Sequence, residues 1–128
     1  KPIKTRKAKN LQDTLVTTGM PFNHPAQVEA TLKLIRHWKE YTRGVRRLGS
    51  AALDLVFVAA GRIDAYIEWG LNAWDIAAGI LILEEAGGKV TDLKGDRNSL
   101  KNGEIVASDR SMHSIFLEGV QTTLEQNQ

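Results

Sequence analysis

The stretch WDIAAGILILEEAGG, residues 74–88, decides the fold class of this chain. Its apolar residues fall on most sides of a helix, which predicts a helix from about Trp74 to Ala86 that lies against a sheet. Gly87 and Gly88 are expected to end this helix, since glycine is the commonest residue after a helical C-terminus. Such a helix needs strands to cover, so the sequence on either side must supply them.

Strand and helix patterns alternate on both sides of this stretch. Residues 63–69 alternate as a strand, and Gly70 and Asn72 follow as a turn. A polar loop is expected over 94–103. The other expected elements are strands at 15–17, 89–92 and 105–107, an extended piece at 45–48, and helices at 26–43, 51–60 and 112–124. This alternation predicts an α/β layered fold with a mixed or mostly parallel sheet and helices on both sides.

Two of these helices carry more detailed expectations. The helix at 51–60 is small or apolar nearly all round, so it should be deeply buried, with Ser50 as its N-terminal cap. The helix at 26–43 should bury an apolar stripe formed by Val28, Leu32, Ile35 and Trp38.

Length and composition indicate one globular domain over residues 1–128. The chain has no cysteine, which excludes a disulfide framework, a zinc ribbon and a cysteine nucleophile. Reduced cytoplasm is the expected setting. No apolar run is long enough to span a bilayer, so no membrane partner is expected. Because the first residue is Lys1, the sequence is expected to start inside a longer chain or after processing.

Basic residues gather at the start of the chain, although the net charge is only +2. We expect this run to be a solvated edge rather than a nucleic-acid surface, because a binding surface would need a stronger basic excess. The residues concerned are Lys1, Lys4, Arg6, Lys7 and Lys9.

Two carboxylates stand where strand and helix ends should meet. Asp75 falls in the first turn of its helix, where the helix dipole keeps a carboxylate ionised and able to bind magnesium. Position alone favours a plain stabilising role for it. Glu68 lies near the carboxyl end of the preceding strand, the edge at which ligands bind in open α/β sheets. From spacing alone, a site residue and a surface glutamate are equally good descriptions of Glu68.

Arg46 and Arg47 precede a glycine and a helix start. Exposed amides at a helix N-terminus together with a guanidinium suit an anion or a hydroxyl-rich ligand. Taken singly, each arginine is better explained by a surface ion pair or by solvation. The histidines show no metal-ligand spacing, so no histidine metal site is expected.

Four blocks of the chain resemble the inositol monophosphatase family. The quoted stretch matches the family's carboxy-terminal signature through Trp74–Gly79 and Glu85–Gly88. The other three blocks are Arg46–Leu55, Gly61–Tyr66 and Leu15–Phe22. Their order and spacing extend the resemblance over nearly the whole chain.

The resemblance implies a fold and roles for particular residues. The fold would be the second α/β unit of the sugar-phosphatase fold. Asp75 would ligate a catalytic Mg²⁺ and approach the substrate, and Glu68 would accept hydrogen bonds from hydroxyls of the sugar alcohol. Substrate contacts would also come from Arg46, Gly49, Ser50 and Ala51. Family members commonly form homodimers and are inhibited by lithium.

Two motifs of the family are missing from this sequence. These are a glutamate-rich motif and a motif of the form Asp-Pro-x-Asp-Gly-Thr. In the family both motifs supply the other metal ligands, and the second also supplies the helix start that binds the phosphate. The chain is therefore expected to be the carboxy-terminal part of a Mg²⁺-dependent phosphatase that hydrolyses inositol monophosphate or a similar small phosphate monoester. Alone it should be inactive, and it should expose an apolar patch and self-associate. The alternative is a non-catalytic interaction or dimerisation module that retains the family fold.

Overall fold

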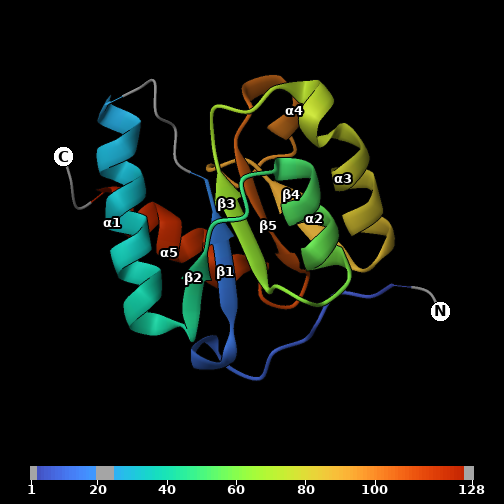
Figure 1. Ribbon diagram of the computed structural model, residues 1–128, viewed down its shortest axis with the longest axis horizontal. Helices are drawn as coiled ribbons and strands as arrows, with labels where there is room; N and C mark the ends of the chain where they lie inside the picture. The colour runs from blue at the N-terminus through green and yellow to red at the C-terminus, as the bar shows by residue number, and fades with distance from the viewer. Residues whose placement is uncertain (1–2, 20–24, 126–128) are drawn as a thin grey trace.

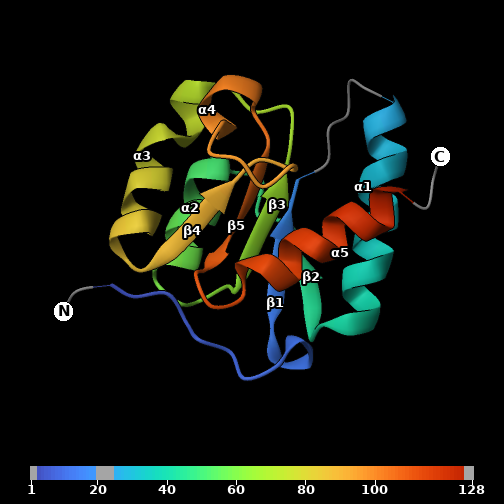
Figure 2. The same ribbon diagram turned by 180° about the vertical axis from the view of Figure 1, so that it is seen from behind.

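The computed structural model describes residues 3–19 and 25–125, and it forms three layers. A five-stranded sheet lies between helices α1 and α5 on one face and α2 and α3 on the other (Figures 1 and 2). The strands are β1 (Leu15–Thr18), β2 (Gly44–Arg46), β3 (Ala65–Glu68), β4 (Gly88–Thr91) and β5 (Ile105–Asp109). The helices are α1 (Pro25–Tyr41), α2 (Ala51–Ala59), α3 (Ala73–Glu85), α4 (Ser99–Asn102) and α5 (His113–Glu125), with a short 3₁₀ turn at Leu11–Asp13.

The sheet is mixed, in the order β2-β1-β3-β5-β4. Strand β1 is parallel to β2 and β3, while β5 is antiparallel to β3 and β4. The predicted α/β class with helices on both faces is confirmed. The end of the block Leu15–Phe22 falls in residues 20–24, outside the described part of the chain. None of the described helices is long and apolar enough to cross a membrane.

Alternation along the central strand divides the hydrophobic residues into two cores. Tyr66 faces α2 and α3, where it packs with Leu55 and Ile76. Its neighbours Ala65 and Ile67 face α1 and α5. Successive side chains of a strand point to opposite faces, so a strand covered on both sides must be apolar throughout.

A glycine allows α3 to lie directly on α2. A Cβ built on Gly79 would lie 2.7 Å from Cδ1 of Leu55, so no larger residue fits without displacing one helix. Helix packing thus explains why residue 79, in the middle of this helix, is a glycine. As predicted, α3 lies against the sheet, but its outward side is open to solvent, where Trp74 is 79% exposed and Leu81 is 61% exposed.

The two detailed helix expectations need correction. In α1 the predicted stripe is right at the buried Trp38 but wrong at Leu32, which is 46% exposed; Thr31 and Leu34 are buried in its place. The cause is α5, whose Phe116 packs against Trp38 with 5.4 Å between ring centroids. In α2 one side is open to solvent, because the α3 and sheet contacts cover only the opposite side.

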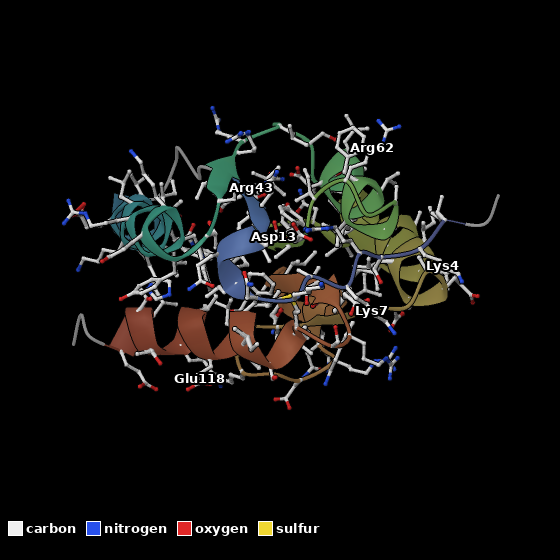
Figure 3. The ribbon with its side chains drawn as sticks, turned by 90° about the horizontal axis from the view of Figure 1, so that it is seen from below. Lys4, Lys7, Asp13, Arg43, Arg62 and Glu118 are labelled. Atoms are coloured by element: carbon white, nitrogen blue, oxygen red, sulfur yellow. The ribbon has the colours of Figure 1, made fainter. Side chains whose placement is uncertain are left out.

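The amino-terminal arm crosses the end of the sheet from α3 to β1 (Figure 2). The backbone N–H of Thr5 donates to the carbonyl of Ala86 at 3.1 Å. Arg6 donates to Oδ1 of Asp64 at 2.8 Å and pairs with Asp13. The prediction of a wholly solvated basic edge is therefore wrong for Arg6, which fixes the arm to the sheet. Lys4 and Lys7 do point outward (Figure 3).

The loop after β4 contains more regular structure than the polar loop expected over residues 94–103. It contains α4 and folds around the buried Asp92. Oδ1 of Asp92 accepts from the N–H groups of Lys94 and Asp96, and Oδ2 accepts from the Asn102 side chain. These donors lower the pKa of Asp92 against the opposing effect of burial. The carboxylate is thus a structural centre of this loop.

Candidate functional site

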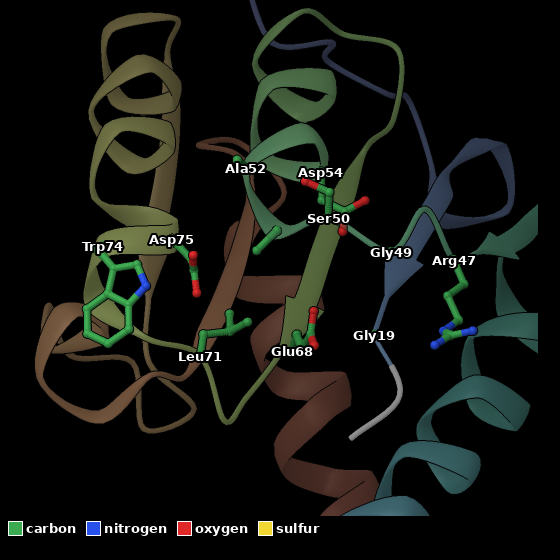
Figure 4. Close-up of a pocket in the computed structure, with 11 residues that line it drawn as sticks. Gly19, Arg47, Gly49, Ser50, Ala52, Asp54, Glu68, Leu71, Trp74 and Asp75 are labelled. Carbon is green, nitrogen blue, oxygen red and sulfur yellow. The ribbon is translucent and has the colours of Figure 1, made fainter. Parts of the chain in front are cut away.

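A hollow of about 530 Å³ opens where β3 ends and where α2 and α3 begin (Figure 4). Two parallel strands finish at this edge, which is where ligands bind in open α/β sheets. Its lining residues are Gly19, Arg47, Gly49, Ser50, Ala51, Ala52, Asp54, Glu68, Leu71, Trp74 and Asp75.

Most of the predicted site residues meet at this hollow. Glu68 is the last residue of β3, and Asp75 lies in the first turn of α3. Ser50 caps α2 as predicted, because its Oγ accepts from the N–H of Leu53 at 3.3 Å. Gly49 and Ala51 line the hollow on either side of it. The structure therefore brings the predicted helix start and two of the three lining carboxylates, Glu68 and Asp75, to one space.

Arg46 does not line this hollow, whereas its neighbour Arg47 does. Successive residues at a strand end point in opposite directions. Arg46 donates to the carbonyl of Val45 and lines an adjacent depression beside Lys39 and Arg43. The structure thus brings Arg47 to the site, and contact of Arg46 with a substrate stays a prediction.

The Glu68 carboxylate is held in place from two sides. The hydroxyl of Tyr66 donates to Glu68 Oε1. On the other side is the backbone of Gly19, where an added Cβ would overlap the carboxylate. Burial raises the pKa of Glu68, opposed by the Tyr66 hydrogen bond and by the positive charge of Arg47. Glu68 is therefore a positioned acceptor with a strong affinity for donors, such as hydroxyl groups.

Asp54 is a site residue that the sequence analysis missed. It is 1% exposed, and its Oδ1 accepts from the Thr17 hydroxyl at 3.0 Å. Burial raises the pKa of Asp54 to about 6, and the nearby charge of Glu68 adds to this, while the Thr17 bond opposes it. A signal was present, since Asp54 is the sole charged residue in the otherwise apolar segment 51–60.

Asp75 is exposed and stands beside Trp74 at the edge of the hollow (Figure 4). The N–H groups of the first α3 turn favour an anionic side chain there. Among the residues the structure describes, no group of three or more histidine, cysteine or acidic residues is placed to hold a metal ion. Magnesium commonly takes one or two protein carboxylates together with water and substrate phosphate oxygens. Asp75 fits one such position, and the described chain does not complete the set.

Comparison with known proteins shows the family of this chain. A sequence model of the inositol monophosphatase family matches residues 1–127. The chain belongs to this family. Inositol monophosphatases are phosphatases that generally depend on a metal, which agrees with an exposed carboxylate at the hollow.

Individual members of the inositol monophosphatase family show the same relationship. The chain is 46% identical to inositol-1-monophosphatase of Mesorhizobium japonicum, over 89% of this chain and 43% of the relative. It is 42% identical to Nus factor SuhB of Pseudomonas aeruginosa, over 91% of this chain and 44% of the relative. Inositol monophosphatase from Anabaena superposes with a TM-score of 0.88 at 38% identity, over 94% of this chain and 48% of that protein.

The chain spans less than half the length of these family members. The resemblance found in the sequence is confirmed, and so is the fold that it implied. The roles of Asp75, Glu68 and the α2 start remain predictions, which the geometry makes specific enough to test.

Proposed function

We propose that this chain forms part of a Mg²⁺-dependent phosphatase that hydrolyses inositol monophosphate or a similar small phosphate monoester. The observation that carries the proposal is the convergence of Asp75, Glu68 and the amino-terminal end of α2 on one hollow. Parallel strands and two helix starts meet there, so carboxylates and backbone donors face the same space.

The polyol would be bound by the wall opposite Asp75. Glu68 is held by Tyr66 and by the Gly19 backbone, so it would accept hydrogen bonds from hydroxyls without reorganising. The backbone around Ser50 would supply donors to the same molecule, and Arg47 would add positive charge. These contacts orient a substrate and do not themselves break a bond.

Asp75 would hold the metal on the side of the leaving group. A bound magnesium ion supplies charge neutralisation at the phosphoryl group and an acidified water. Because the described residues offer too few ligands for a complete site, this chain alone should release no phosphate from inositol 1-phosphate. The family resemblance implies that the complete phosphatase would also form a homodimer and be inhibited by lithium.

Magnesium titration of the ¹⁵N-labelled chain, followed by NMR, tests the metal role of Asp75. We expect amide shifts to begin at the first turn of α3 and to disappear in Asp75→Asn. Glu118→Gln is the matched control, since Glu118 is an exposed carboxylate on α5 in the opposite layer (Figure 3). Equal shifts in Asp75→Asn and in the unchanged chain would contradict the assignment.

Addition of inositol tests the polyol wall by the same method. Amides near Ser50 and Gly19 should shift, and Glu68→Gln should weaken this response because the amide group replaces one acceptor with a donor. A response centred away from these residues would refute the wall.

The second candidate function is a non-catalytic interaction module. The relatives named Nus factor SuhB favour it. The two candidates differ when the rest of the family fold is supplied. A phosphatase part should then restore magnesium-dependent phosphate release that Asp75→Asn abolishes, whereas an interaction module should form a complex without turnover.

A further inference from the structure

The carboxyl group of Asp54 lines the hollow, yet the proposed function gives it no part. Asp54 lies in the first turn of α2, where its backbone N–H donates to the carbonyl of Ser50 at 2.9 Å. Figure 4 shows Asp54 and Ser50 together at the start of α2, which forms one half of the polyol wall. A buried ionisable group in the wall of a ligand site is a candidate for direct contact with the ligand.

The two oxygens of the Asp54 carboxyl group differ in their partners. Oδ1 accepts from the Thr17 hydroxyl at 3.0 Å, and no donor to Oδ2 is found among the described residues. Because Asp54 is 1% exposed, bulk water does not supply the missing partner, although buried polar groups are normally hydrogen-bonded. Oδ2 therefore has hydrogen-bonding capacity that a molecule in the hollow can use.

Asp54 and Glu68 line the same hollow, and their surroundings place the negative charge on Glu68. The carboxylate of Glu68 is compensated by the Tyr66 hydroxyl and by the positive charge of Arg47. Asp54 has the Thr17 hydroxyl, while burial and then the charge of Glu68 raise its pKa. The first of the two carboxyl groups to ionise is therefore Glu68, and the proton stays on Asp54.

A polyol hydroxyl needs a donor as well as an acceptor. Each hydroxyl has one hydrogen to donate and two lone pairs that accept. When the hydrogen is donated to Glu68, the oxygen is left to accept, and a protonated carboxyl group is a suitable donor. We infer that protonated Asp54 donates from Oδ2 to a hydroxyl oxygen of the polyol, so that Asp54 and Glu68 form a donor–acceptor pair selective for neutral polyhydroxyl groups. This specificity-determining contact extends the polyol wall and rests on the proposed function.

Such a pair makes polyol affinity depend on pH in both directions. Ionisation of Asp54 removes the donor and turns lone pairs toward the hydroxyl oxygen, so affinity falls as the pH rises through about 6. At lower pH affinity falls as well, because protonated Glu68 no longer accepts. The side chains that face Asp54 are Thr17 from β1, Tyr66 and Glu68 from β3, Arg47 from the segment before α2 and Asp75 from the start of α3. Affinity in the unchanged chain should therefore pass through a maximum.

Inositol titrations of the ¹⁵N-labelled chain at several pH values test the Asp54 donor. Affinity, read from the amide shifts of Ser50 and Gly19, should fall about 3- to 10-fold between about pH 5.5 and pH 7.5, the effect of losing one hydrogen bond. Asp54→Asn should keep its affinity over this range, because the asparagine amide donates at any pH. Glu118→Gln is the control, since it removes an exposed carboxylate on α5 and should follow the unchanged chain.

Two further measurements separate a ligand contact from a structural role for Asp54. Thr17→Val removes the hydrogen bond that favours ionised Asp54, so the loss of inositol affinity should move to higher pH. The same substitution should cause no such movement when combined with Asp54→Asn. In the unchanged chain, the ¹³Cγ signal of Asp54 reports its ionisation directly, and saturating inositol should move this titration to higher pH.

Three results would overturn the inference about Asp54. Asp54→Asn and the unchanged chain could show the same pH profile, affinity could rise with pH through 6, or inositol could leave the ¹³Cγ titration where it was. If inositol still shifts the Ser50 and Gly19 amides in these cases, the proposed function stands and only the donor role is lost. If inositol shifts neither amide at any pH, the polyol wall and the Asp54 contact are both refuted.

Discussion

Asp54→Asn should stabilise the folded chain at neutral pH. Asp54 is 1% exposed and has one Oδ1 acceptor bond from Thr17. Burial raises its pKa, so ionisation of this carboxyl group costs folding free energy. Asparagine has nearly the same shape, keeps an oxygen that can accept the Thr17 hydrogen, and carries no charge at any pH.

The size of the effect follows from the two pKa values. Burial moves the pKa of Asp54 from 3.8 to about 6. One pKa unit corresponds to about 1.36 kcal/mol, so the ionised carboxylate lowers the free energy of unfolding by up to about 3 kcal/mol. The folded state binds this proton more tightly than the unfolded state does. The stability from the protonated form is therefore complete below about pH 4 and is lost as the pH rises through about 6.

Urea unfolding followed by tryptophan fluorescence at several pH values measures this difference. Between pH 3.5 and 4 the wild-type chain and Asp54→Asn should differ little. Above pH 7 the variant should be more stable by about 1–3 kcal/mol, since part of the cost is relieved by local relaxation. The difference should develop between about pH 4 and pH 6.

Thr17→Val serves as the companion variant, because it removes the donor that favours the ionised carboxylate. It should destabilise the chain more above pH 6 than at pH 4. Asp54→Asn could raise the free energy of unfolding equally at every pH, or lower it at pH 7.5. Either result would refute the assignment of Asp54 as a buried carboxylate with a raised pKa.

Two glycines give further predictions. Gly19→Ala should displace the Glu68 carboxylate, so inositol-dependent NMR shifts should weaken while thermal unfolding changes little; unchanged shifts would show that the Gly19 backbone does not position Glu68. Gly79→Ala should destabilise the chain by about 1–3 kcal/mol in urea unfolding, because the new methyl group meets Leu55. Helix propensity alone predicts the opposite sign, a gain of about 1 kcal/mol, so stabilisation by Gly79→Ala would contradict the close α2–α3 contact.

Much of the candidate site could be read from the sequence. Ser50 as a cap, Glu68 at a strand end and Asp75 in the first helical turn are local features, and each agrees with the structure. Their meeting at one hollow follows from a general property of α/β sheets, in which strand ends and helix starts share one edge. Local sequence thus predicted the elements and where they meet.

Residues whose role depends on distant partners were misjudged. Arg6 was expected in a solvated edge and instead pairs with Asp64, 58 positions later. Asp54 was overlooked because its raised pKa arises from burial beneath β1 and β3. The Arg6 ion pair has no signature within a short window of sequence. The lone charge of Asp54 in an apolar segment hints at burial but does not give its pKa, because ion pairing and desolvation depend on which segments pack together.

The sequence by itself determined that the chain alternates strands and helices, and that residues 74–88 form an apolar helix ended by glycine. Tertiary structure alone decided which side of each helix is covered. Leu32 is exposed because α5 packs against the neighbouring face of α1, and Leu81 is exposed because α2 and the sheet occupy only the opposite side of α3. Periodicity reports how apolar residues are distributed around a helix, but burial depends on the neighbour that each face meets.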